Sequence, residues 1–140
     1  MGSITINESA NRISVGTLGR GIWSTDLLCY DESPIYISNY QTWNSDQSIC
    51  NDIVIQNNGT LLLQDMKLIL PFEGCIYIEN GGKLILDNTT LENSNIFAKA
   101  GSETELINNT VLKVYQNDKL YFENGSTCEL DTSKIEFYNE

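Results

Sequence analysis

One stretch of the sequence is repeated, and this repeat constrains the fold more than any other feature. Residues 52–70 and 76–91 share a pattern of alternating apolar residues around a turn rich in Asn and Gly. At an offset of 23 residues, Ile53, Ile55, Gly59, Leu61, Leu63 and Leu68 match Ile76, Ile78, Gly82, Leu84, Leu86 and Leu91. Two further copies follow at offsets of 20 and 24, with Ala98, Leu106 and Val111 and then Phe122, Leu130 and Ile135. A fixed period of this size indicates structural units that stack on one another.

Each copy contains three short stretches suited to β-strands, with polar turns between them. Strands this short cannot bury an apolar face alone, but copies stacked about 4.8 Å apart would bury continuous apolar columns. The turns leave no room for helices, and parallel crossovers are almost always right-handed. The sequence therefore predicts an all-β fold, a right-handed parallel β-helix of about four to five short coils. Two inward columns are predicted, one of Ile55, Ile78, Ala98 and Phe122 and one of Leu63, Leu86, Leu106 and Leu130.

One turn position carries Asn57, Asn80, Ala100 and Asn124 in the four copies. Asn tolerates positive φ and can hydrogen-bond a stacked neighbour, so these residues are predicted to form a structural ladder at one corner.

The N-terminal part does not follow the repeat. Its short alternating stretches, broken by glycines, predict a β-hairpin-like segment. Residues 29–34 are polar and end in Pro34, as expected of a linker. The predicted organisation is an N-terminal strand segment at residues 1–28, a linker at 29–34 and the β-helix at 35–140.

Both ends of a stacked array need to be covered. Trp43 precedes the first full copy and is interpreted as a lid over the apolar column, with a sugar-stacking platform as the alternative. After the last copy, residues 135–140 provide no comparable lid. We expect the last coil to pack against the rest of a longer chain or against another copy.

The composition excludes several function classes. The net charge is −11, with 8 Lys and Arg and no His. An acidic chain without basic clusters is a poor candidate for binding nucleic acid or an anionic membrane surface. No apolar run approaches the roughly 20 residues of a membrane span. We expect neither nucleic acid binding nor membrane insertion.

The four cysteines, Cys29, Cys50, Cys75 and Cys128, lack the C-x-x-C spacing of zinc and redox motifs. An even count fits disulfides in an exported protein and fits free thiols equally well. If the protein is exported, Cys29 and Cys50 are the predicted pair, joining the linker to the lid segment before the first coil. Cys75 and Cys128 would lie two coils and about 10 Å apart, too far for a bridge.

No residue set forms a recognisable catalytic centre. The chain has no His for a triad and no Gly-x-Ser-x-Gly motif. Glu79 and Glu123 would lie about 10 Å apart in one outward column, near the separation used in sugar hydrolysis. Stacked coils produce such pairs without any function, however. We predict no enzymatic activity, no catalytic residues, no metal site and no cofactor.

An outward column of Val54, Tyr77, Phe97 and Tyr121 is more informative. Exposed aromatic side chains can stack on sugar rings or cover a protein partner, and ordinary cross-strand packing is the third interpretation. Tyr77, Phe97 and Tyr121 are therefore the candidate ligand-binding residues.

Two stretches resemble known families. Residues 15–27, VGTLGRGIWSTDL, resemble the closing strands of the last blade in sialidase-like β-propellers. The GGKLILD block at residues 81–87, within the strand and turn pattern of residues 35–95, resembles the parallel β-helical segments near the C-terminal end of large secreted or surface proteins of Bacteroidetes bacteria. The resemblance extends loosely over residues 96–137. It implies an extracellular location and supplies no catalytic residues.

The expected function is a non-catalytic structural or spacer module of a larger secreted or cell-surface bacterial protein. The alternative is a carbohydrate-binding or adhesion module that uses the aromatic column. A fragment of a polysaccharide-degrading enzyme is a third, less favoured interpretation, because the turns are short.

Overall fold

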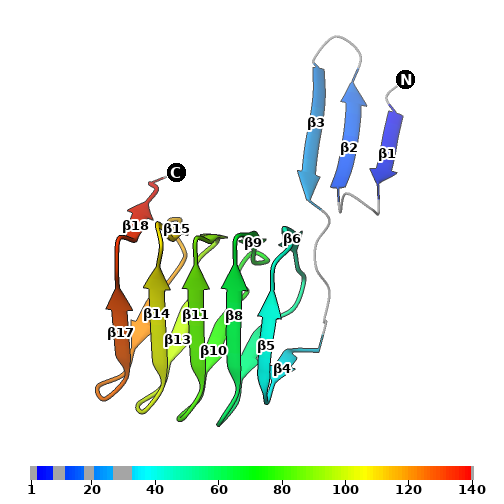
Figure 1. Cartoon of the computed structure of the whole chain (residues 1–140). Coiled ribbons are helices and arrows are strands. Elements are labelled where there is room, and N and C mark those ends of the chain that lie inside the picture. The colour runs from blue at the N-terminus through cyan, green and yellow to red at the C-terminus, as the bar shows by residue number, and fades with distance from the viewer. Residues whose placement is uncertain (1–2, 8–11, 18–20, 27–32, 140) are drawn as a thin grey trace. The chain divides into compact units, whose positions relative to one another are not determined.

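The chain falls into two compact units, Met1–Tyr30 and Asp31–Glu140. The structure is a computed structural model (Figure 1), and it describes residues 3–7, 12–17, 21–26 and 33–139. In the first unit, three strands form an antiparallel sheet in the order β1-β2-β3: β1 (Ser3–Asn7), β2 (Arg12–Thr17) and β3 (Gly21–Asp26). This sheet agrees with the predicted hairpin-like segment. Most of the predicted linker lies outside the described residues.

The second unit contains three parallel sheets of five strands each. The first sheet consists of β4 (Ile35–Ile37), β7 (Ile53–Ile55), β10 (Ile76–Ile78), β13 (Ile96–Ala98) and β16 (Leu120–Phe122). The second consists of β5 (Tyr40–Trp43), β8 (Thr60–Gln64), β11 (Lys83–Asp87), β14 (Glu103–Ile107) and β17 (Thr127–Leu130). The third consists of β6 (Gln47–Ser48), β9 (Lys67–Ile69), β12 (Thr90–Glu92), β15 (Val111–Val114) and β18 (Lys134–Phe137).

Each coil passes once through each of the three sheets, which makes the second unit a β-solenoid. In Figure 1 the second sheet faces the viewer with its strands pointing up, and the chain returns behind it. Successive coils advance from β5 to β17, so the winding is right-handed. No described residue is helical. The predicted all-β parallel β-helix is therefore confirmed, with residues 35–48 forming a first coil in register with the repeat.

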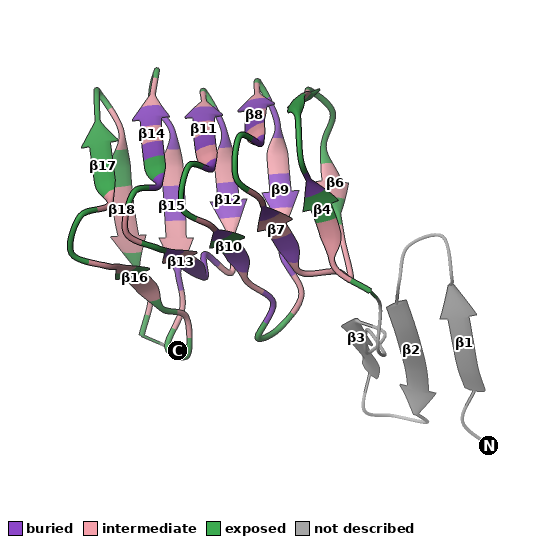
Figure 2. Cartoon of the chain, turned by 90° about the horizontal axis from the view of Figure 1, so that it is seen from below, coloured by how far each residue is buried: buried purple, intermediate pink, exposed green. Residues whose placement is uncertain are grey.

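The backbone pairing confirms both predicted inward columns. Ile55, Ile78, Ala98 and Phe122 pair in order across the first sheet, and Leu63, Leu86, Leu106 and Leu130 pair in order across the second. In the middle coils the members are fully buried, visible as purple bands in β8, β11 and β14 (Figure 2). Fully burying one such side chain contributes about 1.5–3 kcal/mol, so the columns stabilise the stack.

One predicted register is wrong. The offset of 20 places Val111 over Leu91, but Leu112 is the residue that pairs with Leu91, and Ile135 in turn pairs with Leu112. The coil has one more residue at the corner between β14 and β15, where residues 108–109 both have positive φ, 53° and 65°. The corner absorbs the additional residue, and the following strand keeps an apolar side chain inward.

At the corner between the first and second sheets, one residue of each coil from the second onward adopts the left-handed backbone conformation, and these residues form a ladder. The positive φ angles fall at Asn58 (63°), Gly81 (76°), Gly101 (79°) and Gly125 (95°). The N–H of Gly81 donates to the carbonyl of Gly101, and that of Gly101 to Gly125, at 3.0 and 2.9 Å. The predicted Asn ladder lies one residue earlier, and its role differs. A Cβ on Gly81 would lie 2.3 Å from Oδ1 of Asn57, so the Asn side chain fills the space beside the glycine of the next coil.

The two ends of the solenoid differ in how well the column is covered. Trp43 of the first coil pairs with Leu63 of the second coil and packs against the core, in agreement with a lid. At the other end, β17 is exposed along its length, and β17 and β18 are largely green and pink in Figure 2. Leu130 is 49% exposed although it pairs with the fully buried Leu106, and Phe137 is 72% exposed. The last coil thus presents apolar surface to solvent.

Candidate ligand-binding groove

The predicted aromatic column lies on the outer face of the first sheet. Tyr77, Phe97 and Tyr121 stand at the middle positions of β10, β13 and β16 and pair in order. The ring centroids of Tyr77 and Phe97 are 6.2 Å apart, and those of Phe97 and Tyr121 are 4.7 Å apart. Beyond Val54, the column continues to the exposed Tyr36, a member that the sequence analysis missed.

The rings are stacked along the solenoid axis rather than laid flat on the sheet. Phe97 and Tyr121 are inclined by only 24°, so each covers one face of the other. A platform for several sugar rings needs aromatic faces open to solvent, and this pair does not provide one as a whole. Tyr121 lies on the edge strand β16, and among the described residues its second face has no aromatic neighbour.

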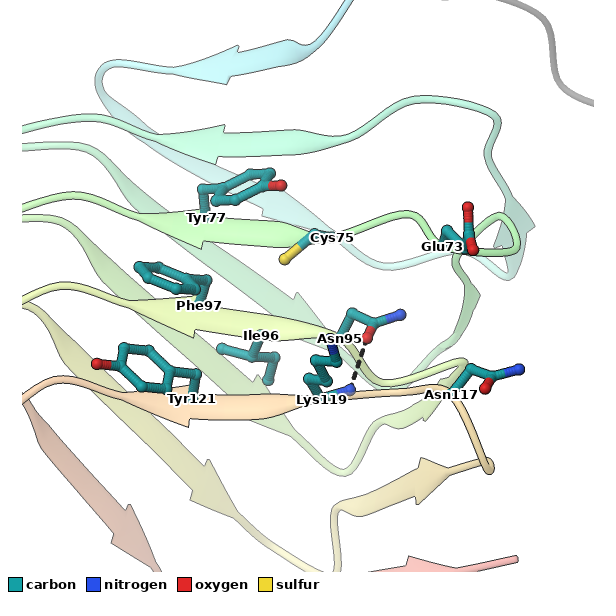
Figure 3. Close-up of a pocket in the computed structure, with 9 residues that line it drawn as sticks. All are labelled: Glu73, Cys75, Tyr77, Asn95, Ile96, Phe97, Asn117, Lys119 and Tyr121. Atoms are coloured by element: carbon teal, nitrogen blue, oxygen red, sulfur yellow. Dashed lines mark hydrogen bonds between the residues drawn. The ribbon is translucent and has the colours of Figure 1, made fainter. Parts of the chain in front are cut away.

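A groove of about 400 Å³ lies beside these rings (Figure 3). The three rings form one side, and the other side comes from the starts of β10 and β13 and the turns before β10 and β16. Its polar lining consists of Glu73, Cys75, Asn95, Asn117 and Lys119. The groove therefore combines an aromatic wall with a hydrogen-bonding wall.

Asn95 holds the polar wall in place. Its side-chain amide donates to Oδ1 of Asp118 at 3.1 Å, and its Oδ1 accepts the backbone N–H of Lys119 at 2.6 Å. The second bond is the dashed line in Figure 3. Two coils earlier, Oδ1 of Asp52 accepts the backbone N–H of Cys75 at 2.8 Å. These bonds fix the chain just before the first strand of successive coils.

Three side chains of the groove keep their hydrogen-bonding capacity. In the described part of the chain, no hydrogen bond or ion pair engages the side chains of Glu73, Asn117 or Lys119, and all three are exposed. They supply a carboxylate, an amide and an ammonium group at the rim of the groove.

Cys75 belongs to the polar wall and is a free thiol (Figure 3). Burial raises the pKa of this thiol to about 11, and the nearby negative charge of Asp52 acts in the same direction. Near neutral pH this raised pKa keeps Cys75 in the thiol form, which is less nucleophilic than the thiolate.

The other cysteines are placed as follows. Cys128 is free, exposed, and in register with Thr104 and Leu84 of the inward column. Cys50 is disulfide-bonded. Cys29 lies outside the described residues, so the Cys29–Cys50 pair stays a prediction.

Two further properties concern ions and membranes. Within residues 33–139 and the three N-terminal strands, no three His, Cys, Asp or Glu side chains are grouped so that they could hold a metal ion. The same residues include no helix of the length and hydropathy that a membrane crossing requires.

The sequence analysis found the aromatic wall but not the polar wall. The signal was present, because Cys75, Asn95 and Lys119 each directly precede the first strand of a coil. They therefore lie two residues before Tyr77, Phe97 and Tyr121, on the same face of the sheet. Extending the aligned copies backwards by one residue would have revealed this second column.

Three parallel sheets connected coil by coil define the chain's second unit as a β-solenoid. Comparisons with protein-family models, with curated proteins and with solved structures find no match for the chain.

Proposed function

We propose that the solenoid is a non-catalytic structural module of a larger secreted or cell-surface bacterial protein, in which it acts as a stiff spacer. One observation carries the proposal. Neighbouring coils are linked by ion pairs on an outer face and by side-chain hydrogen bonds at the corners, in addition to the packing of their core.

The third sheet carries one such outer ladder. Glu92 lies between Lys67 and Lys113 of the neighbouring coils, at 2.8 and 3.2 Å. Burial raises the pKa of Glu92, but the hydrogen bonds from the two lysines outweigh it and hold the pKa below its usual value. Partly exposed pairs of this kind contribute about 0–1 kcal/mol each, so they order the surface more than they stabilise the fold.

The corners are tied in the same way. The side-chain amide of Asn88 donates to Oδ1 of Asp65, and that of Asn108 donates to Oδ1 of Asp87, both at 2.7 Å. Hydrogen bonds between coils at the corners oppose bending of one coil against the next. A stack restrained at its core, faces and corners is suited to hold two attached domains at a fixed distance.

The location and the partner are part of the proposal. The resemblance of residues 35–95 to β-helical segments of Bacteroidetes surface proteins supports an extracellular role. The exposed apolar side chains on β17 and β18, Leu130 and Phe137, support a partner that docks on these two strands of the last coil, either the rest of a parent chain or another copy.

Pulsed electron paramagnetic resonance tests the spacer role. Thr42 and Glu129 are exposed positions in one outward column of the second sheet, four inter-strand steps apart. With Cys75 and Cys128 replaced by Ser, spin labels at these two positions should give one narrow distance distribution near 19 Å, since each step is about 4.8 Å.

A one-coil deletion provides the matched variant. Removing residues 53–75 joins Asp52 to Ile76, which matches Ile53 in the repeat. The label distance should shorten by one step, about 4.8 Å, with the distribution still narrow. A broad or multi-component distribution in the full chain would show that the coils bend and would exclude a stiff spacer.

A further inference from the structure

Beyond a spacer role, the groove on the first sheet has the chemistry of a binding site. We propose that it binds a neutral oligosaccharide, held between the Tyr121 ring and the polar side chains of Asn117 and Lys119.

The two walls of the groove match the two kinds of surface that a sugar presents. A pyranose ring has an apolar face of C–H groups and a rim of hydroxyl groups. The exposed parts of Tyr77 and Tyr121 offer the apolar contact, and the unengaged side chains of Glu73, Asn117 and Lys119 offer donors and acceptors to hydroxyls. A volume of about 400 Å³ lies within the range of small-ligand sites, roughly 300–1,000 Å³.

Tyr121 is the residue on which a sugar ring can stack. Phe97 covers one face of the Tyr121 ring at 4.7 Å and thereby holds the ring in position. The opposite face is turned away from Phe97, toward the open edge of the sheet, because β16 is the edge strand and Tyr121 is 51% exposed. A sugar unit stacked there lies at the β16 end of the groove, next to Asn117 and Lys119. A ring held on one face and open on the other gives stacking at a low entropic cost.

The charges favour a neutral ligand over an anionic one. The groove lining carries one acid, Glu73, and one base, Lys119, whereas the whole chain has a net charge of −11. The electrostatic field of this net negative charge repels polyanions such as uronate or sulfated polymers. The central strands β10 and β13 are paired on both sides and offer no free backbone edge to an extended peptide; the free edge is that of β16 at the end of the sheet.

The test is a glycan array that contains neutral hexose and pentose oligomers together with oligogalacturonides and sulfated glycans. We expect binding to neutral oligomers. In calorimetric titrations with the best of these, Tyr121→Ala and Lys119→Ala should each weaken binding about tenfold or more. Lys119→Gln should retain most of the affinity, because an amide can replace the ammonium as a hydrogen-bond donor to a hydroxyl.

Tyr138→Ala is the matched control. Tyr138 also belongs to the last coil and stacks on another ring, that of Tyr115 at 5.1 Å, but it does not line the groove. The control should bind normally, and circular dichroism should show that all variants are folded. The proposal is overturned if no neutral oligomer binds, if the anionic glycans bind better, or if Tyr138→Ala weakens binding as much as Tyr121→Ala.

Discussion

At position 81, two separate constraints exclude a side chain. Gly81 has a φ of 76°, a conformation that costs residues with a Cβ roughly 1–2 kcal/mol. In addition, a Cβ there would lie 2.3 Å from Oδ1 of Asn57 in the previous coil. The first constraint is local to the backbone, and the second arises only because the coils are stacked.

Substitutions of Gly81 and Asn57 separate the two constraints. Gly81→Ala should lower the free energy of unfolding by at least about 1–2 kcal/mol, measured by urea denaturation. Adding Asn57→Ala removes the close contact but leaves the backbone conformation unchanged. The double variant should therefore lose less stability than the sum of the two single variants. Additive losses would show that the Asn57 side chain does not occupy this space in solution.

At the same scale, the sequence predicted the position of the corner, but it assigned the positive φ to Asn80 instead of Gly81. Asn80 and Gly81 are adjacent, and both residue types adopt positive φ readily. Local preference alone cannot decide which of them does so. The close approach of Asn57 from the neighbouring coil, which excludes a Cβ at position 81, is a contact that a single repeat read in isolation does not contain.

At the scale of the element, position within the stack decides what an apolar residue contributes. Leu86 and Leu130 occupy the same column of the second sheet, but Leu86 is fully buried and Leu130 is 49% exposed. Leu86→Ala should cost about 2–5 kcal/mol, because it leaves a cavity between two covering coils. Leu130→Ala should cost clearly less in the same denaturation experiment. Equal costs would mean that another surface covers the last coil in solution.

The inward columns were predictable for a physical reason. Alternation within each strand fixes which side chains are buried, and a slip by one residue would reverse all of them. The corners obey no such rule, and for this reason Leu112 rather than Val111 lies over Leu91. The polar wall of the groove was missed because Asn95 and Lys119 stand just outside the strands, so they show in the alignment of the copies and not in the apolar alternation within them.

At the scale of the whole molecule, the last coil combines exposed apolar side chains on β17 and β18, Leu130 and Phe137, with the free edges of these two strands. Such edges can pair with another chain. If another copy is the partner, light scattering should show a mass that rises with concentration, and Leu130→Asp should restore the monomer. Phe72→Asp is the control, since Phe72 is 74% exposed but lies outside the last coil. A monomer at all concentrations, or an equal effect of Phe72→Asp, would argue against self-association through this coil.

The additional residue at the corner of residues 108–109 bears on how such a chain can change during evolution. The neighbouring coils keep their pairing although this coil is longer at that corner. A coil can therefore be longer at a corner without disturbing the pairing of its neighbours. We expect a duplicated or deleted coil to change the reach of the molecule by about 4.8 Å and to leave its cross-section the same.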